Sequence, residues 1–257
     1  MEKEERLALF ERELSYIKDE KIKEFAKKVI EDADDYFFTV PASSSGKYHP
    51  DFARGEGGLV RHTKAVVFFT AEFCRSEFEF GTINARQAQL LIVAAIAHDI
   101  KKQGDGSTGH TLMKEHPLYG AEYIKKENDK YGLLSDEDVE YIYKAIRSHM
   151  GPWCDVKPET RAELTLFYAD YAASRAEITG LKFIDGNGDS AEMPEAPVYE
   201  KPKMTIDEYK FDFSKMRGLT LKEAYDKDAS FLNWIANKEG FGNPEVQNLV
   251  KEFLKTV

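Results

Sequence analysis

The chain has 257 residues, of which 42% are hydrophobic and 32% are charged, an ordinary globular composition for one large or two modest domains. Lysine and arginine number 36 against 46 acidic residues, so the formal net charge is −10. That balance argues against a protein that coats nucleic acid through a basic face. The first residues lack the apolar stretch of a signal peptide, and the longest apolar run, 90–97, is too short to cross a bilayer. We therefore expect a cytoplasmic protein with no membrane partner.

The N-terminal part, residues 1–56, is expected to be a helical segment and a loop that pack on the core of the protein. Residues 2–38 are rich in charge and then in aromatic side chains, and they are predicted to be mostly helical. Residues 41–58 are rich in glycine, serine and proline, which is typical of a loop.

The core is expected to span residues 57–180, and its first helices each carry a histidine. Apolar residues between 59 and 74 recur at helical spacing, with His62 on the same face. A second helix, over about 86–99, ends in the pair His98-Asp99. Pro117 is typical of a first helical residue, which would make His116 the N-cap of the next helix.

Two further helices are predicted from their start signals. Ser135, followed by three acidic residues, is a good N-cap for a helix that carries His149. Thr160 begins a capping-box pattern for a helix that carries Asp170. Each of the five core helices therefore has a histidine or aspartate on or beside its apolar face.

The composition of the sequence changes after residue 180. Residues 181–203 are predicted to be a turn and a proline-containing linker, and residues 204–257 a small accessory module. The module is expected to have a core of its own, made of Phe213, Leu219, Leu221, Phe231 and Trp234. The whole chain is thus predicted to be all-α: a helical bundle followed by a small, mostly helical (α or α+β) module.

Imidazole and carboxylate are the side chains that bind divalent transition metals. One histidine on a helix face is more often an ordinary core or surface residue, but here nearly every histidine lies on a different helix beside acidic partners. A structural zinc site would favour cysteines. Cys74 and Cys154 lack metal-type spacing, so we expect reduced thiols. The mixed His/Asp set suits one or two ions of Mn, Fe, Zn, Mg, Ni or Co, with Asp99 placed to bridge two of them.

The order His62, His98-Asp99, Asp170 resembles the pattern of the HD-domain phosphohydrolase superfamily, over about residues 45–176. Four stretches look most similar to the HD-type 3′–5′ exoribonucleases and ribonuclease Y: 57–62 (Gly-Gly-Leu-Val-Arg-His), 115–121 (Glu-His-Pro-Leu-Tyr-Gly-Ala), 148–151 (Ser-His-Met-Gly) and 169–175 (Ala-Asp-Tyr-Ala-Ala-Ser-Arg). The chain departs from them at Met150, where a second histidine often follows.

The resemblance implies roles for particular residues. The first metal would be held by His62, His98, Asp99 and Asp170, and the second by His116 and His149 together with Asp99. Lys102 matches the lysine that often follows the His-Asp pair and would neutralise charge that develops on the phosphate. Arg61 and Arg175 are candidates for phosphate contacts, and His49 is expected to line the pocket.

By this resemblance the chain would hydrolyse phosphate esters of nucleic acid or oligonucleotides with metal-activated water. Two alternatives stay open: a nucleotidase or nucleoside triphosphohydrolase that acts on free nucleotides, and a non-catalytic nucleotide-sensing protein. The C-terminal module is similar to one found in exodeoxyribonuclease X-like proteins, on the segments 213–224 and 228–235. There Lys215 and Arg217 could contact a nucleic-acid backbone.

Overall fold

A computed structural model describes residues 1–43, 49–106, 109–177, 205–211, 213–238, 241 and 244–257. The chain divides into two compact units, Met1–Tyr199 and Glu200–Val257. The described residues contain α-helices and short 3-10 turns, and the one β feature among them is an isolated bridge between Lys210 and Thr220. The prediction of an all-α protein is therefore confirmed for the described part of the chain.

The first unit begins with four short or medium helices: α1 (Lys3–Ala8), α2 (Glu11–Ser15), α3 (Glu20–Glu31) and α4 (Asp35–Thr39). The side chain of Asp19 caps α3 by accepting from the backbone N–H groups of Lys21 and Ile22. Helix α3 buries Ile22, Phe25, Ala26, Val29 and Ile30, and it packs against α1, α6 and α7. The expectation of a mostly helical N-terminus is thus confirmed.

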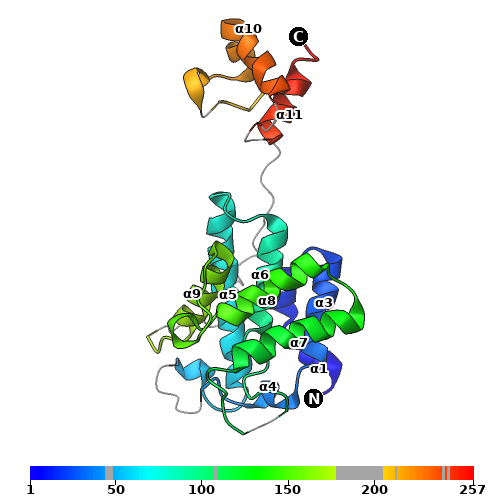
Figure 1. The fold of residues 1–257 in the computed structure, drawn as a ribbon, viewed down its shortest axis with the longest axis vertical. Helices are drawn as coiled ribbons and strands as arrows, with labels where there is room; N and C mark the ends of the chain where they lie inside the picture. Colours follow the sequence, from blue (N-terminus) through cyan, green and yellow to red (C-terminus); the bar gives the residue numbers. More distant parts are fainter. Residues whose placement is uncertain (44–48, 107–108, 178–204, 212, 239–240, 242–243) are drawn as a thin grey trace, which may run out of the picture. The chain divides into compact units, whose positions relative to one another are not determined.

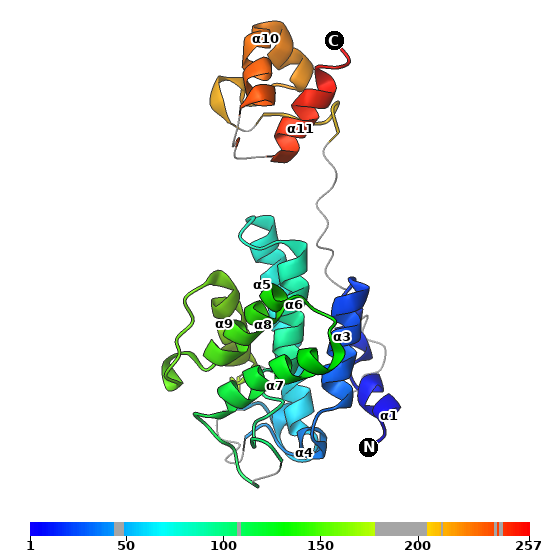
Figure 2. The same ribbon diagram turned by 45° about the vertical axis from the view of Figure 1, so that its right-hand side comes forward.

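The core of this unit is built from five longer helices: α5 (Gly58–Glu79), α6 (Ala85–Ala97), α7 (His116–Tyr131), α8 (Asp136–Ser148) and α9 (Arg161–Ala173), with the 3-10 turns η1 (Asp51–Ala53) and η2 (Gly151–Trp153) between them. Helices α5, α6, α8 and α9 pack in a closed ring, since each contacts the next and α9 contacts α5. Figures 1 and 2 both show α3 and α9 on opposite sides of the α5–α6 pair. Every residue of α6 from Ala88 to Ala97 is buried, which makes it the central helix.

The helix ends largely match their sequence signals. Ser135 and Thr160 cap α8 and α9 as predicted, each accepting from a backbone N–H three residues on. The prediction for His116 was wrong by one residue: it is the first residue of α7 and Glu115 is the N-cap. Proline fits either of the first two helical positions, because neither backbone N–H there has a partner inside the helix.

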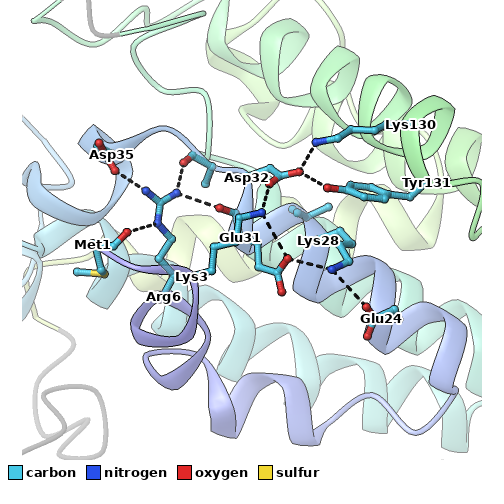
Figure 3. A network of polar contacts seen from close by, with 12 residues as sticks. Met1, Lys3, Arg6, Glu24, Lys28, Glu31, Asp32, Asp35, Lys130 and Tyr131 are labelled. Atoms are coloured by element: carbon cyan, nitrogen blue, oxygen red, sulfur yellow. Dashed lines mark hydrogen bonds and ion pairs between the residues drawn. The ribbon is translucent and has the colours of Figure 1, made fainter.

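A network of ion pairs ties the N-terminus to α3 and α7 (Figure 3). The carboxylate of Asp32 accepts from Lys3 at 2.8 Å, from Lys130 at 2.5 Å and from the hydroxyl of Tyr131. The guanidinium of Arg6 donates to Asp35 and to the backbone oxygens of Met1, Glu31 and Ala33. Burial works to raise the pKa of Asp32, but its donors outweigh burial and hold that pKa below its ordinary value.

The second unit contains η3 (Ser214–Met216), α10 (Leu221–Asn237) and α11 (Pro244–Phe253). Its buried core includes Phe211, Met216, Leu221, Leu232 and Val250. The expectation that Trp234 belongs to this core was wrong, because 51% of its surface is exposed. Trp234 lies at the edge, where its ring stacks on Phe231 at 6.0 Å between centroids. The buried face of α10 is formed by other residues of that helix.

Two further expectations concern this part of the chain. The ammonium of Lys215, a candidate for contacting nucleic acid, pairs with Asp228 at 2.6 Å. The predicted linker at 181–203 lies outside the described residues. Among the helices that the structure does describe, none is both long and apolar enough to span a bilayer.

Candidate metal centre

Six histidine and aspartate side chains from distant parts of the sequence meet inside the first unit. His62 lies in α5, His98 is the C-cap of α6, and Asp99 follows directly. His116 begins α7, His149 is the C-cap of α8, and Asp170 lies in α9. The structure thus brings together all six residues that the sequence suggested as metal ligands.

Asp99 lies between two groups of histidines. Its Oδ2 faces the Nε2 atoms of His62 and His98, at 3.7 and 3.5 Å. Its Oδ1 faces the Nε2 atoms of His116 and His149, at 3.1 and 3.8 Å. Each half of the carboxylate therefore has its own pair of imidazoles, and the ligand atoms of each group lie within 4.8 Å of one another.

Asp170 completes the first of these groups. Its Oδ1 lies 3.1 Å from Nε2 of His62 and 3.8 Å from Nε2 of His98. The first group therefore offers two imidazoles and two carboxylates, whereas the second offers two imidazoles and the shared Asp99. We call them the Asp170 group (His62, His98, Asp99, Asp170) and the His149 group (Asp99, His116, His149).

Backbone carbonyls orient three of the imidazoles. The Nδ1 atoms of His98, His116 and His149 lie 2.7, 2.8 and 2.7 Å from the carbonyl oxygens of Ala95, Leu112 and Ile146. A carbonyl oxygen can only accept, so each Nδ1 donates its proton to it and each Nε2 faces the centre, where it carries a lone pair when the ring is neutral. This is the usual arrangement for histidines that bind a metal through Nε2.

Several polar atoms at the centre are buried and have no hydrogen-bond partner among the described residues. They are both ring nitrogens of His62, Nε2 of His98 and Oδ1 of Asp99. The Nε2 atoms of His116 and His149 are only 3.2 Å apart, although each presents a lone pair in its Nδ1-protonated form. Leaving buried polar atoms unpaired costs about 1–3 kcal/mol each. A divalent cation would satisfy the Nε2 lone pairs of these histidines and Oδ1 of Asp99 together, so the donor set fits a metal.

The charge states at the centre agree with this fit. Burial, followed by the neighbouring His116 and His98, lowers the pKa of His149 to about 3. Burial also lowers the pKa of His62, against the opposing effect of Asp170. Burial opposes ionisation of Asp99 as well, but Lys102 and His98 outweigh it and hold the pKa of that carboxyl well below its ordinary value. Burial works to lower the pKa of His98, but Asp99 and Asp170 outweigh burial and raise that pKa above its ordinary value. The centre thus favours the neutral form of His62 and His149 and the ionised form of Asp99, the forms that bind metals.

The centre forms the floor of a cavity of about 540 Å³. Asp99, His116 and Asp170 reach its surface. Lys102 lies beside them, with Nζ 2.5 Å from Oδ2 of Asp99. The other described lining residues come from four segments: Ala42, Ser43 and His49; His110, Thr111 and Met113; Met150 and Trp153; and Phe167, Tyr171, Ser174 and Arg175.

The three predicted substrate-binding residues lie in different surroundings. Arg175 lines the cavity, and so does His49, whose ring stands edge-on to His62 at 5.1 Å. Burial, followed by His62, lowers the pKa of His49 to about 3, so its imidazole is neutral at pH 7. Arg61 is not among the lining residues. Its Nε and Nη2 donate to the carbonyl oxygens of Phe52 and Arg54 at 2.5 and 2.8 Å, which ties the preceding loop to α5.

The sequence-based reasoning missed one feature of the cavity: the three aromatic residues Trp153, Phe167 and Tyr171 along one side. A signal for them was present, because Tyr171 directly follows Asp170 and Trp153 lies four residues after His149. Helical periodicity did not identify them, since it groups apolar residues with the core. Only the packing of η2 on α9 shows that they face a cavity.

A ring of helices that brings histidines and aspartates to one buried centre is the arrangement of a helical domain with a candidate metal site. Residues 59–174 match the family model of the HD domain. This match covers all six candidate ligands and supports assignment of the region to the HD superfamily. An HD domain implies a metal-dependent phosphohydrolase. Searches of curated proteins and of solved structures gave no match.

Proposed function

We propose that the chain is a metal-dependent phosphodiesterase that hydrolyses phosphate esters of nucleic acid or oligonucleotides. One observation carries the proposal: the two oxygens of Asp99 each face a separate pair of histidines, at the floor of an open cavity. A carboxylate shared in this way suits two ions held close together, the arrangement that clamps a phosphoryl group.

A divalent ion at this centre supplies a Lewis acid and lowers the pKa of water. The residues of the chain contribute charge and position. The ammonium of Lys102 lies at the cavity surface beside Asp99, where it can neutralise charge on the phosphoryl oxygens. The guanidinium of Arg175 lines the same cavity and can bind a phosphate through two N–H groups.

The choice of oligonucleotides over free nucleotides rests on the sequence resemblance to HD-type ribonucleases. A substrate screen tests it directly. The full chain is incubated in Mn²⁺ with end-labelled single-stranded RNA and DNA and, separately, with a panel of mononucleotides. We expect the oligonucleotides to be shortened. Release of phosphate or pyrophosphate from mononucleotides, with the oligonucleotides intact, would establish the nucleotidase alternative instead.

Two matched variants connect any activity to the centre. Asp99→Asn keeps the size of the side chain but removes the shared charge, and it should abolish hydrolysis. Asp105→Asn makes the same change at an exposed carboxylate six residues further along, and it should leave hydrolysis unchanged. A chain that binds nucleotides, hydrolyses none of these esters and contains no metal by elemental analysis would be a non-catalytic sensor.

A further inference from the structure

We propose that Trp153, Phe167 and Tyr171, here called the aromatic wall, form a subsite that stacks the base of a nucleotidyl phosphate ester. The proposal rests on the proposed function and deepens it, because it assigns recognition of the base to particular residues. Base–aromatic stacking tolerates any base, since every base offers a flat π-face.

The three rings of the aromatic wall lie close together. The rings of Trp153 and Tyr171 are nearly parallel, with an interplanar angle of 7° and centroids 5.9 Å apart. The ring of Phe167 lies 6.2 Å from Trp153 and 6.1 Å from Tyr171. Even so, Trp153 is 53% exposed and Tyr171 is 40% exposed. Large aromatic groups left open at the side of a cavity are a common sign of a ligand site.

The backbone of η2 is shaped to hold this wall. Gly151 has a φ of +52°, a region that side chains other than glycine rarely adopt. A Cβ atom at this position would lie 2.4 Å from Cε2 of Phe167. Only glycine therefore lets η2 approach α9 closely enough for Trp153 to stack on Tyr171.

The aromatic wall and the metal centre are carried by the same elements. Tyr171 follows the candidate ligand Asp170 in α9, and Gly151 lies two residues after His149. The wall, Asp99 and Lys102 all line one cavity. A ligand whose phosphate lies on the floor can therefore reach the aromatic wall with the rest of the molecule.

The charges in the cavity favour a nucleotide over a purely apolar ligand. The guanidinium of Arg175 lies over the ring of Tyr171, at 4.3 Å from its centroid. It therefore places a cation next to a stacking surface, and Lys102 adds a second cation near the floor. An anionic phosphate joined to a flat aromatic base matches both features.

Binding can be measured without turnover. The chain has two tryptophans, so Trp234→Phe leaves Trp153 as the only one. This variant is titrated in Mg²⁺ with adenosine 5′-monophosphate and with ribose 5-phosphate, which lacks the base. We expect fluorescence quenching by the first ligand, with an affinity about 5- to 150-fold higher than for the second, the range of stacking on one aromatic residue. Equal affinities for the two ligands would overturn the proposal.

Turnover provides a second test with two substrates that release the same product. The p-nitrophenyl ester of thymidine 5′-monophosphate carries a base, whereas methyl p-nitrophenyl phosphate does not. We expect Trp153→Ala and Tyr171→Leu to lower kcat/KM about 5- to 150-fold for the first substrate and to change it little for the second. Tyr168→Ala is the control, because Tyr168 is an exposed tyrosine of the same helix that does not line the cavity.

The outcomes separate this proposal from the proposed function. If hydrolysis of both esters requires Asp99 but Trp153→Ala lowers kcat/KM to the same extent for the two, the phosphodiesterase is retained and the base subsite is rejected. Base-dependent quenching of Trp153 with no hydrolysis of any ester would keep the subsite and reject the phosphodiesterase. Retained hydrolysis of the methyl ester in the Trp153 and Tyr171 variants also shows that they fold.

Discussion

Two polar clusters of the first unit differ in how their charges are satisfied. Around Asp32, the chain supplies both signs: two lysines and a tyrosine hydroxyl surround one carboxylate (Figure 3). Around Asp99, the chain supplies one lysine, Lys102, together with Asp170 and four imidazoles, and several of the imidazole and carboxylate atoms are buried without a hydrogen-bond partner among the described residues. In the first cluster the carboxylate has hydrogen-bond donors from the chain, so the cluster connects parts of the fold. In the second cluster several lone pairs have no donor and can bind a cation. The two clusters are therefore distinguished by whether their lone pairs are satisfied, and not by the number of their charges.

The strongest test of this difference is removal of the shared carboxylate. Asp99→Ala should abolish metal binding by both the Asp170 group and the His149 group. It should also lower activity by more than about 100-fold, because loss of a residue that only contacts a metal ligand already lowers metal affinity or activity by about 10- to 100-fold. Elemental analysis and hydrolysis rates measure both effects. Asp32→Asn, a change in the other cluster, should retain the metal. Full metal content in the Asp99 variant would contradict the assignment.

Metal should also stabilise the fold through one cluster only. A ligand that binds only the native state stabilises it by about 2.7 kcal/mol when the ligand concentration is 100 times the Kd. We therefore expect the Tm of the wild-type chain to rise when Mn²⁺ is added and to fall back to its metal-free value when EDTA is added. Asp32→Asn should start from a lower Tm but show the same rise, whereas Asp99→Ala should show none. An identical rise in all three proteins would indicate that Mn²⁺ acts elsewhere.

A substitution at Met150 is expected to strengthen binding of the second ion. This residue follows His149 and lines the cavity, and the His149 group has fewer carboxylates than the Asp170 group. Met150→His adds an imidazole, and it should raise the affinity for the second ion by about tenfold, the lower end of the effect of an outer-shell partner. Calorimetric titration with Mn²⁺ measures this. Met113→His, at an exposed lining residue, is the control and should leave the second affinity unchanged.

The smallest expected effect concerns pH and the Asp32 cluster. The pKa of Asp32 is lowered in the folded state, so its pairing stabilises the fold above the unfolded value of about 3.9. That contribution is lost as the pH falls below about 4. The difference in Tm between the wild-type chain and Asp32→Asn should therefore be greatest near neutral pH and shrink in acid. A difference that grows in acid would contradict this assignment.

Much of the fold could be predicted because its signals are local. Apolar periodicity and capping residues such as Ser135 and Thr160 depend on neighbours within one or two turns, and they identified the core helices correctly. Trp234 shows the limit of such reasoning. Its aromatic character suggested burial, but which side of α10 is covered depends on the rest of the second unit.

By itself, the sequence determined which residue types are present to bind a metal and in what order they occur. Only the tertiary structure decided how they meet. It placed each oxygen of Asp99 against its own pair of histidines and committed Arg61 to backbone carbonyls. It also assembled the aromatic wall from η2 and α9. The physical reason is that a contact between residues far apart in the chain depends on how whole helices pack, and no local pattern encodes that packing.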